Sequence, residues 1–194
     1  MNNLYDKEEY NDWLTSKSID SRYMVGDYTY GKPEIFNYTN DFSNLEIGKF
    51  CSIANGTKII IGGKHESNFI TTFPLSTFFN VEHPISKSPV RSNKIVIGND
   101  VWIAQDVTIL SGVTIGDGSI VGAGSIVTKN VLPYTFVAGN PTKIIKNRFS
   151  ALEVEKLLEI KWWTWDIDEI KKVAPLLLSE DISKFIKRYG DIDE

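Results

Sequence analysis

The sequence is poor in the residues from which many catalytic centres are built. Its 194 residues include one cysteine, Cys51, and two histidines, His65 and His83. A single cysteine excludes an intrachain disulfide. Two histidines and one cysteine also cannot supply the three-histidine ligand set of a carbonic-anhydrase-type zinc site. We therefore expect an enzyme of another class and no metal cofactor.

The chain also lacks a dominant charge and any long apolar run. Twenty-one Lys and Arg residues oppose 25 Asp and Glu residues, giving a net charge of −4, which argues against nucleic-acid binding. No run of about 18 apolar residues could span a bilayer, and no charged start followed by an apolar stretch indicates a secretion signal. We expect a cytoplasmic protein with neither a nucleic-acid nor a membrane partner.

A six-residue repeat dominates the middle of the sequence. Residues 97–132 divide into IGNDVW, IAQDVT, ILSGVT, IGDGSI, VGAGSI and VTKNVL. Ile or Val opens every block, Gly stands second in three of them, and the fifth position is Val or Ser. The same register is visible earlier, in IGKFCS and IANGTK at residues 47–58, and again in VGDYTY at residue 25.

This repeat predicts a mainly-β fold, a left-handed parallel β-helix in which three hexapeptides close one triangular coil. The first and fifth side chains of each block are expected to point inward. Cys51 occupies a fifth position and is therefore interpreted as a small core residue. The second-position glycines are expected to serve a demanding backbone conformation at the corners.

Two segments fall outside the repeat. Residues 63–94 form an excursion that carries both histidines and the aromatic residues Phe69, Phe73, Phe78 and Phe79. Long excursions from a regular scaffold are usually functional or disordered, and these phenylalanines argue against disorder. The domain organisation we expect is a β-helix over residues 1–149, which includes a short helix at residues 5–16, and a helical extension over residues 150–194 that packs on it.

The helical extension has recognisable start signals. Ser150 with Glu153 forms a capping box, and Asp166 with Glu169 repeats the device for a second helix expected to end near Pro175. Residues 181–189 are expected to form a third helix. The tryptophans at positions 162, 163 and 165 are expected to pack these helices on the flank of the β-helix.

A β-helix does not dictate a reaction, so the functional classes must be weighed on residues. A nucleotidyl-transferring enzyme would need a separate Gly-rich phosphate-binding domain, for which the N-terminal segment is too short. An acyltransferase needs a general base, and imidazole suits that role near neutral pH. His65 follows Gly62 and Gly63 where the chain leaves the coil, whereas His83 is interpreted as a surface or loop-packing residue. A trimeric scaffold without turnover is the alternative from another class.

The sequence resembles the xenobiotic acetyltransferase family of hexapeptide-repeat proteins, which includes chloramphenicol and streptogramin O-acetyltransferases. The resemblance covers nearly the whole chain. Its motifs are MVGDYTYG at 24–31, LEIGKFCSIANG at 45–56, GGKH at 62–65, TTFPL at 71–75, IGNDVWIA at 97–104, IGDGSIVGAGSIVTKNVLPYTFVAGNPTKIIKNRF at 115–149 and LLEIKWWTW at 157–165.

The resemblance implies an acetyl-CoA-dependent O-acetyltransferase with His65 as the catalytic base and direct transfer in a ternary complex. It also implies a homotrimer with active sites between subunits. The positions that match the family's acetyl-CoA site are Trp102, Ala104, Gln105, Gly122, Ala123, Thr128, Lys129, Pro141, Lys143 and Lys146. The positions that match its acceptor pocket are Tyr30, Phe36 and Asn37.

Two departures bear on the acceptor. The family commonly has Asn before the catalytic histidine and Arg after it, whereas this sequence has Lys64 and Glu66; Ala104 stands where Gly is common. The acceptor is expected to be a small molecule with a hydroxyl group. Within that expectation, an antibiotic of the chloramphenicol or streptogramin A type and a sugar or polysaccharide hydroxyl are the two alternatives.

Overall fold

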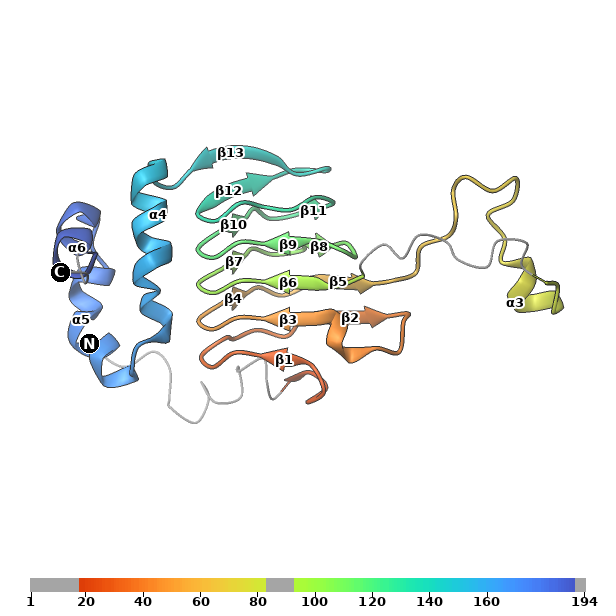
Figure 1. Cartoon of the computed structure of the whole chain (residues 1–194), viewed down its shortest axis with the longest axis horizontal. Helices are drawn as coiled ribbons and strands as arrows, with labels where there is room; N and C mark the ends of the chain where they lie inside the picture. Colours follow the sequence, from red (N-terminus) through yellow and green to blue (C-terminus); the bar gives the residue numbers. More distant parts are fainter. Residues whose placement is uncertain (1–17, 83–92, 191–194) are drawn as a thin grey trace.

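The computed structural model describes residues 18–82 and 93–190, and its largest part is a three-sided stack of short strands (Figure 1). Each side is one parallel sheet. The first contains β1 (Met24–Val25), β3 (Leu45–Ile47), β6 (Ile95–Ile97) and β9 (Thr114–Ile115); the second contains β4 (Ser52–Ile53), β7 (Trp102–Ile103), β10 (Ile120–Val121) and β12 (Thr135–Ala138); the third contains β2 (Glu34–Asn37), β5 (Lys58–Ile61), β8 (Thr108–Ile109) and β11 (Ile126–Val127). A final strand, β13 (Lys143–Asn147), pairs antiparallel with β12 and closes one end of the stack. A short 3₁₀ turn at Phe42–Asn44 precedes β3.

The strand register confirms that three hexapeptides make one coil. Val96 pairs with Thr114, eighteen residues later, and Trp102 pairs with Ile120 at the same separation. One coil lower, Ser52 pairs with Trp102, fifty residues later. The excursion therefore adds residues between two coils without shifting the pairing on either side of it.

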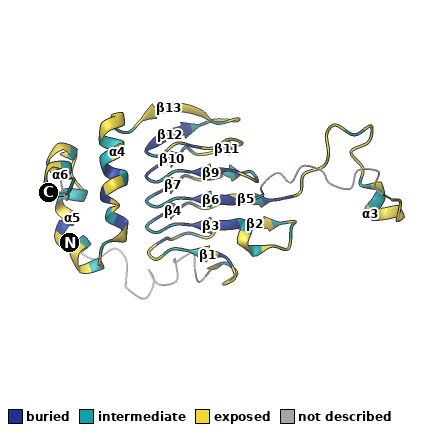
Figure 2. Ribbon diagram, in the orientation of Figure 1, coloured by how far each residue is buried: buried dark blue, intermediate teal, exposed yellow. Residues whose placement is uncertain are grey.

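The inward positions of the repeat are the ones that the sequence predicts (Figure 2). The buried first and fifth residues of the blocks between residues 97 and 131 are Ile97, Val101, Ile103, Val107, Ile109, Val113, Ile115, Ser119, Val121, Ser125, Val127 and Val131. The two buried serines satisfy their hydroxyl groups locally, since Ser119 donates to the Leu132 carbonyl and Ser125 to the Gly122 carbonyl. Cys51 is also buried, as expected of a core residue.

The expected role of the second-position glycines is wrong. Gly98 and Gly116 do not have positive φ angles; a Cβ atom at either would instead lie 2.7 or 2.5 Å from a backbone nitrogen of the next coil. Close approach of stacked coils excludes a side chain there. The left-handed conformation belongs to the fourth position of the block, where Asp100 and Asp106 have φ angles of 54° and 58°.

The C-terminal part forms helices along one flank of the β-helix (Figure 1). They are α4 (Ala151–Ile160), a 3₁₀ turn at Trp162–Thr164, α5 (Ile167–Leu177) and α6 (Ile182–Tyr189). The capping box of Ser150 and Glu153 is present, and Asp181 caps α6 by accepting from the Lys184 N–H. The second capping prediction is wrong, because the Asp166 side chain makes no capping hydrogen bond. Helix α5 also continues two residues beyond Pro175, because a proline in the last turn removes only one hydrogen bond.

The tryptophans pack this flank as predicted. Trp162 contacts Phe50 of the β-helix with ring centroids 5.0 Å apart, Trp163 is buried, and Trp165 lies 5.0 Å from Tyr189 of α6. The helix expected at residues 5–16 lies outside the described residues. Among the residues that are described, no helix has the length and apolar character needed to cross a membrane.

Candidate active site

The excursion begins at a firmly anchored corner of the β-helix. The chain leaves β5 through Gly62 and Gly63, whose φ angles of 74° and 70° are in the left-handed region that favours glycine. The N–H of Gly62 donates to the buried hydroxyl of Ser111, 2.9 Å away, and the Lys64 ammonium donates to the Ser111 carbonyl. The same hydroxyl lies 3.2 Å from the side-chain oxygen of Asn93, where the excursion returns. Ser111 therefore joins the two ends of the excursion.

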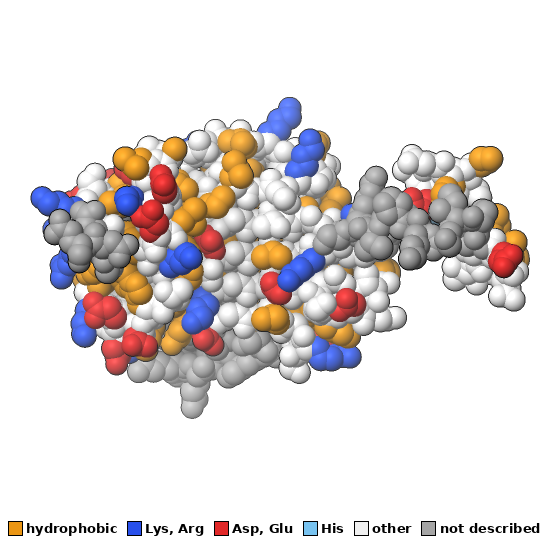
Figure 3. All heavy atoms as spheres, in the orientation of Figure 1, with side chains coloured by type: hydrophobic (Ala, Val, Ile, Leu, Met, Phe, Trp, Pro, Cys, Tyr) orange, Lys and Arg blue, Asp and Glu red, His pale blue; other side chains and the backbone are white. Residues whose placement is uncertain are grey.

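Beyond this anchor the excursion projects away from the β-helix as an arm (Figures 1 and 3). Its outer part contains the short helix α3 (Leu75–Phe79), and Phe73 packs on Phe78 with ring centroids 5.1 Å apart. Much of this apolar surface is uncovered: Ile70 is fully exposed, and Phe78 and Phe79 are about two-thirds exposed. A single copy of the chain therefore leaves the arm only partly packed.

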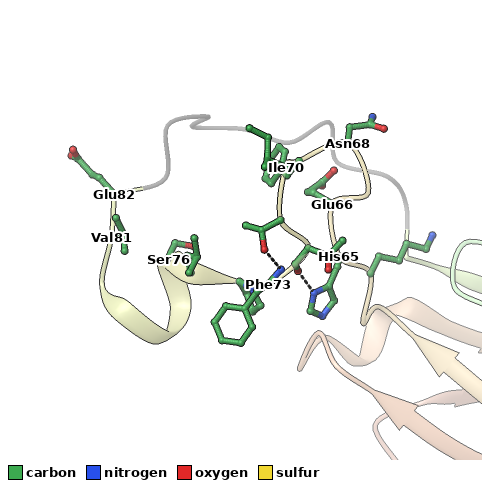
Figure 4. Close-up of a pocket in the computed structure, with 14 residues that line it drawn as sticks. His65, Glu66, Asn68, Ile70, Phe73, Ser76, Val81 and Glu82 are labelled. Carbon is green, nitrogen blue, oxygen red and sulfur yellow. Dashed lines mark hydrogen bonds between the residues drawn. The ribbon is translucent and has the colours of Figure 1, made fainter.

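A cavity of about 620 Å³ lies within the arm (Figure 4). Most of the cavity surface is apolar. Four ionisable residues of the described chain line it: Lys64, His65, Glu66 and Glu82. The other described lining residues are Asn68, Phe69, Ile70, Thr71, Thr72, Phe73, Pro74, Leu75, Ser76 and Val81. Predominantly apolar cavities with a few polar groups are typical of small-molecule sites. His83 lies outside the described residues.

The His65 ring is oriented by the arm's own backbone. Its Nδ1 atom lies 2.6 Å from the carbonyl oxygen of Thr72 (Figure 4). A carbonyl oxygen can only accept a hydrogen bond, so Nδ1 carries the proton of the neutral ring and Nε2 has the free lone pair. This is the tautomer that a general base needs.

The residues predicted for the acceptor pocket lie elsewhere on the chain. Tyr30 and Phe36 are partly exposed, on the N-terminal coil and on β2. The Asn37 amide is engaged in the turn that follows, donating to the Tyr23 hydroxyl and accepting from the N–H of Thr39. Tyr30 shares a separate hollow of about 410 Å³ with Gln105. None of the three is among the described residues that line the His65 cavity.

The predicted donor residues lie at two corners of the β-helix and on β13. The first group occupies successive layers of one corner, connected by the Gly124 N–H donating to the Gln105 carbonyl and the Ile126 N–H donating to the Gly139 carbonyl. Its members are Ala104, Gln105, Gly122, Ala123 and Pro141, beside the half-exposed Trp102 of β7. Thr128 and Lys129 follow β11 at the next corner, above Ser111. Lys143 and Lys146 are exposed on β13.

Two features of the site were not found from the sequence. The orienting partner of His65 is a backbone carbonyl, which any residue type could supply at position 72. Ser111 is in the third position of an ordinary repeat block, and its partners Gly62 and Asn93 are 49 and 18 residues away. The serine in ILSGVT was the only available signal.

A cysteine nucleophile does not fit this structure. Burial raises the pKa of the Cys51 thiol to about 12, and the thiol donates to the Gly98 carbonyl in the core. Within residues 18–82 and 93–190, no group of three or more His, Cys, Asp or Glu side chains is placed to hold a metal ion.

Comparison with known proteins assigns the chain to the hexapeptide-repeat acetyltransferases. Residues 94–129 match the bacterial transferase hexapeptide family (six repeats). The chain is 35% identical over 200 residues to a chloramphenicol acetyltransferase of Morganella morganii, covering 94% of each chain. It is 37% identical to a virginiamycin A acetyltransferase of Staphylococcus aureus, covering 93% of this chain and 86% of the relative.

Among solved structures, a hexapeptide-repeat-containing acetyltransferase from Vibrio cholerae matches with a TM-score of 0.50 and 25% identity. The match covers 66% of this chain and 64% of that one. The chain belongs to the xenobiotic acetyltransferase family of hexapeptide-repeat proteins, and it is an acyltransferase.

Proposed function

We propose that the protein is an acetyl-CoA-dependent O-acetyltransferase that acts on a hydroxyl of an antibiotic-like molecule, with His65 as the general base. One observation carries the proposal. His65 Nδ1 lies 2.6 Å from the Thr72 carbonyl, which orients the ring so that, in its neutral form, Nε2 is the nitrogen with the lone pair beside a cavity of about 620 Å³. That arrangement matches the needs of proton abstraction from a bound alcohol.

The proposed reaction proceeds in one ternary complex. His65 Nε2 takes the proton of the acceptor hydroxyl while the hydroxyl oxygen attacks the thioester carbonyl carbon of acetyl-CoA. The tetrahedral intermediate collapses with cleavage of the carbon–sulfur bond. The imidazolium then returns the proton to the CoA thiolate, which gives the acetyl ester and free CoA. Because the Cys51 thiol is buried and protonated, no acetyl-cysteine intermediate is part of this mechanism.

The proposed donor site follows the corner that contains Ala104, Gln105, Gly122, Ala123 and Pro141. The small residues Gly122 and Ala123 allow the pantetheine arm to approach the backbone, and Trp102 packs near the thioester. Thr128, Lys129, Lys143 and Lys146 serve the nucleotide end, where ammonium groups attract the phosphates of CoA.

The proposed assembly is a homotrimer with active sites between subunits. In one copy the His65 cavity is lined only by described residues of the arm, and the predicted donor residues lie on the β-helix. The arm also presents uncovered Ile70, Phe78 and Phe79. Docking the arm on a neighbouring β-helix would bury this surface and bring the donor to His65, with Tyr30, Phe36 and Asn37 completing the acceptor pocket. We place this enzyme in the cytoplasm, where acetyl-CoA is available.

The acceptor class is proposed from the cavity and from the relatives. The cavity lining includes the apolar side chains of Phe69, Ile70, Phe73, Leu75 and Val81, which suit an apolar acceptor better than a free sugar. The relatives described above are named for acetylation of chloramphenicol and of virginiamycin A.

The test is thiol release from acetyl-CoA with chloramphenicol, a streptogramin A compound and simple sugars as acceptors. Turnover is expected with an antibiotic, and His65→Ala is expected to reduce kcat by about 10²-fold or more. His83→Ala is the matched control and is expected to stay within about twofold of the native protein, as befits a histidine without a catalytic role. Binding of acetyl-CoA to His65→Ala, measured by calorimetry, should be retained.

Each proposed element has an outcome that contradicts it. Equal turnover by His65→Ala and the native protein rejects the base assignment. Turnover on sugars alone moves the acceptor to glycans with the same chemistry. Failure of the native protein to bind acetyl-CoA rejects the donor.

A further inference from the structure

The backbone that orients His65 belongs to the motif TTFPL at residues 71–75. The carbonyl oxygen of Thr72 lies 2.6 Å from His65 Nδ1, and the N–H of Phe73 belongs to the same peptide unit. Because a trans peptide unit is planar, its carbonyl and its N–H point in opposite directions and turn together. Whatever holds the N–H of Phe73 therefore also holds the carbonyl that contacts His65.

The side chain of Thr71 holds this N–H. Its Oγ1 atom accepts a hydrogen bond from the Phe73 N–H at 3.1 Å (Figure 4). Threonine and serine hydroxyls stabilise local turns of the backbone in this way. Two hydrogen bonds thus act on opposite sides of one peptide unit, with the Thr71 hydroxyl on one side and the His65 ring on the other.

The rest of the motif restricts Phe73 from its C-terminal side. Pro74 disfavours helical backbone angles at Phe73, because a residue that precedes proline is confined to extended conformations. The Phe73 carbonyl accepts a hydrogen bond from the Leu75 N–H at 2.8 Å. These contacts leave the hydroxyl of Thr71 as the described side-chain group that acts on the N-terminal side of Phe73.

The orientation of this peptide unit decides which ring nitrogen of His65 can act as a base. A flip of the unit would exchange its carbonyl and its N–H. His65 Nδ1 would then face a donor and accept its hydrogen bond, so the proton of the neutral ring would reside on Nε2. That tautomer has no lone pair on Nε2 and cannot take a proton from a hydroxyl there.

We propose that Thr71 is a positioning residue for the acetyl transfer. Its hydroxyl holds the peptide unit between Thr72 and Phe73 in the orientation that keeps the lone pair of neutral His65 on Nε2. The inference rests on the proposed function, since it concerns the base of that reaction. It requires a hydroxyl at position 71, which serine would supply as well as threonine.

Three substitutions at position 71 separate the hydroxyl from the shape of the side chain. Thr71→Val keeps the branched shape without the hydroxyl, Thr71→Ala removes both, and Thr71→Ser keeps the hydroxyl. The Val and Ala variants are expected to lower kcat about tenfold with little change in the KM for acetyl-CoA, because part of the molecules hold a misoriented base. Thr71→Ser should stay within about twofold of the native protein. The matched control is Thr77→Val, at an exposed threonine of α3 that is not among the described residues lining the cavity.

A spectroscopic measurement tests the tautomer without relying on activity. The chain has only two histidines, so nitrogen-15 histidine labelling of a His83→Ala background leaves His65 as the only labelled residue. At alkaline pH, where imidazole is neutral, NMR is expected to show a protonated Nδ1 and an unprotonated Nε2. Thr71→Val and Thr71→Ala should increase the form with the proton on Nε2. Thr71→Ser and Thr77→Val should not.

Three results would overturn the proposal. They are a proton on Nε2 in the protein with threonine at position 71, an unchanged tautomer in both Thr71→Val and Thr71→Ala, or a loss of activity in Thr71→Ser as large as in Thr71→Val. Thermal unfolding and acetyl-CoA binding establish that each variant is folded. Failure of the proposed function gives a different pattern, because His65→Ala would then keep full activity while the tautomer of His65 would still respond to Thr71.

Discussion

The hydroxyl of Ser111 accepts a hydrogen bond from the N–H of Gly62 at a distance of 2.9 Å, and it reaches Asn93 on its other side. One buried group thus connects the residues at the two ends of the arm, beside the Lys64 ammonium, which donates to the carbonyl of the same serine. The position of His65, three residues after Gly62, depends on this connection.

We expect Ser111→Ala to reduce activity by loosening the base of the arm. The substitution leaves the N–H of Gly62 buried without its acceptor, which costs about 1–3 kcal/mol. The expected kinetic effect is a decrease of about tenfold in kcat/KM, accompanied by faster proteolysis within the arm. Steady-state kinetics and limited proteolysis measure the two effects.

The control for Ser111 is Ser119→Ala. Ser119 is also buried and would lose one hydrogen bond to the Leu132 carbonyl, but it makes no hydrogen bond to the described part of the arm. It should reduce stability without exposing the arm to protease. If both variants expose the arm equally, the anchoring role of Ser111 is refuted.

Two glycine substitutions separate close packing from backbone conformation. A Cβ atom at Gly98 would lie 2.7 Å from the backbone nitrogen of Asp117, whereas one at Gly124 meets no atom within 4 Å but requires a φ angle of 67°. Gly98→Ala should therefore destabilise by about 3 kcal/mol or more, because the coils must move apart. Gly124→Ala should lower the free energy of unfolding by about 1–2 kcal/mol, because only the strained φ angle of the new alanine contributes. Thermal unfolding at one protein concentration ranks them, and the reverse order would contradict the steric explanation.

The stability of the protein is expected to depend on pH through Asp100. Burial raises the pKa of this carboxyl from 3.8 to about 6, with Arg148 lowering it and Asp117 raising it. The folded state thus binds the proton more tightly than the unfolded state does. The associated stability is present below pH 4 and is lost as the pH rises through 6.

Asp100→Asn removes this dependence, since asparagine also tolerates the left-handed conformation. At pH 8 the variant should melt higher than the native protein by on the order of 2 °C, and near pH 4 the difference should vanish. Asp106→Asn is the control, because Asp106 has the same backbone conformation at an exposed corner. A constant difference across pH 4–8 would disprove the role of the Asp100 carboxyl.

The proposed nucleotide contacts of Lys143 and Lys146 can be tested with a shortened donor. Replacing both by alanine should raise the KM for acetyl-CoA about tenfold while changing kcat little, because two charge-assisted contacts are lost from binding. With acetyl-dephospho-CoA, which lacks the 3′-phosphate, the difference should shrink. The control is the double alanine variant of Lys171 and Lys172, which pair with Asp168 and Glu169 on α5. An effect of equal size with both donors would argue against phosphate recognition.

The β-helix was predictable because its rules are local. Each block places its first and fifth side chains inward irrespective of the rest of the chain, so Ile97 and Val101 could be assigned from six residues. The capping box at Ser150 was predictable for the same reason, since its partner is three residues away. The fourth-position turn was not predicted although Asp and Gly recur there, because glycine also recurs at the second position and would tolerate the same conformation.

The parts that were not predictable depend on distant or backbone partners. Arg148 meets Asp100 only because the chain returns to the same corner 48 residues later. The Thr72 carbonyl that orients His65 has no sequence signature. The motif GGKH indicated that His65 lies where the chain leaves a coil. The orientation of its ring depends on the Thr72 carbonyl and could not be predicted from the sequence.

The pairing of Ser52 with Trp102 across a fifty-residue interval has a practical consequence. The coils below and above the arm stay in register whatever is inserted between them, so the arm is an interchangeable module on a fixed frame. Grafting the arm of another member of the family between Gly62 and Asn93 would exchange the cavity around His65 and leave the proposed donor corner unchanged. Replacing this one segment can therefore change the range of substrates while the packing of the β-helix stays the same.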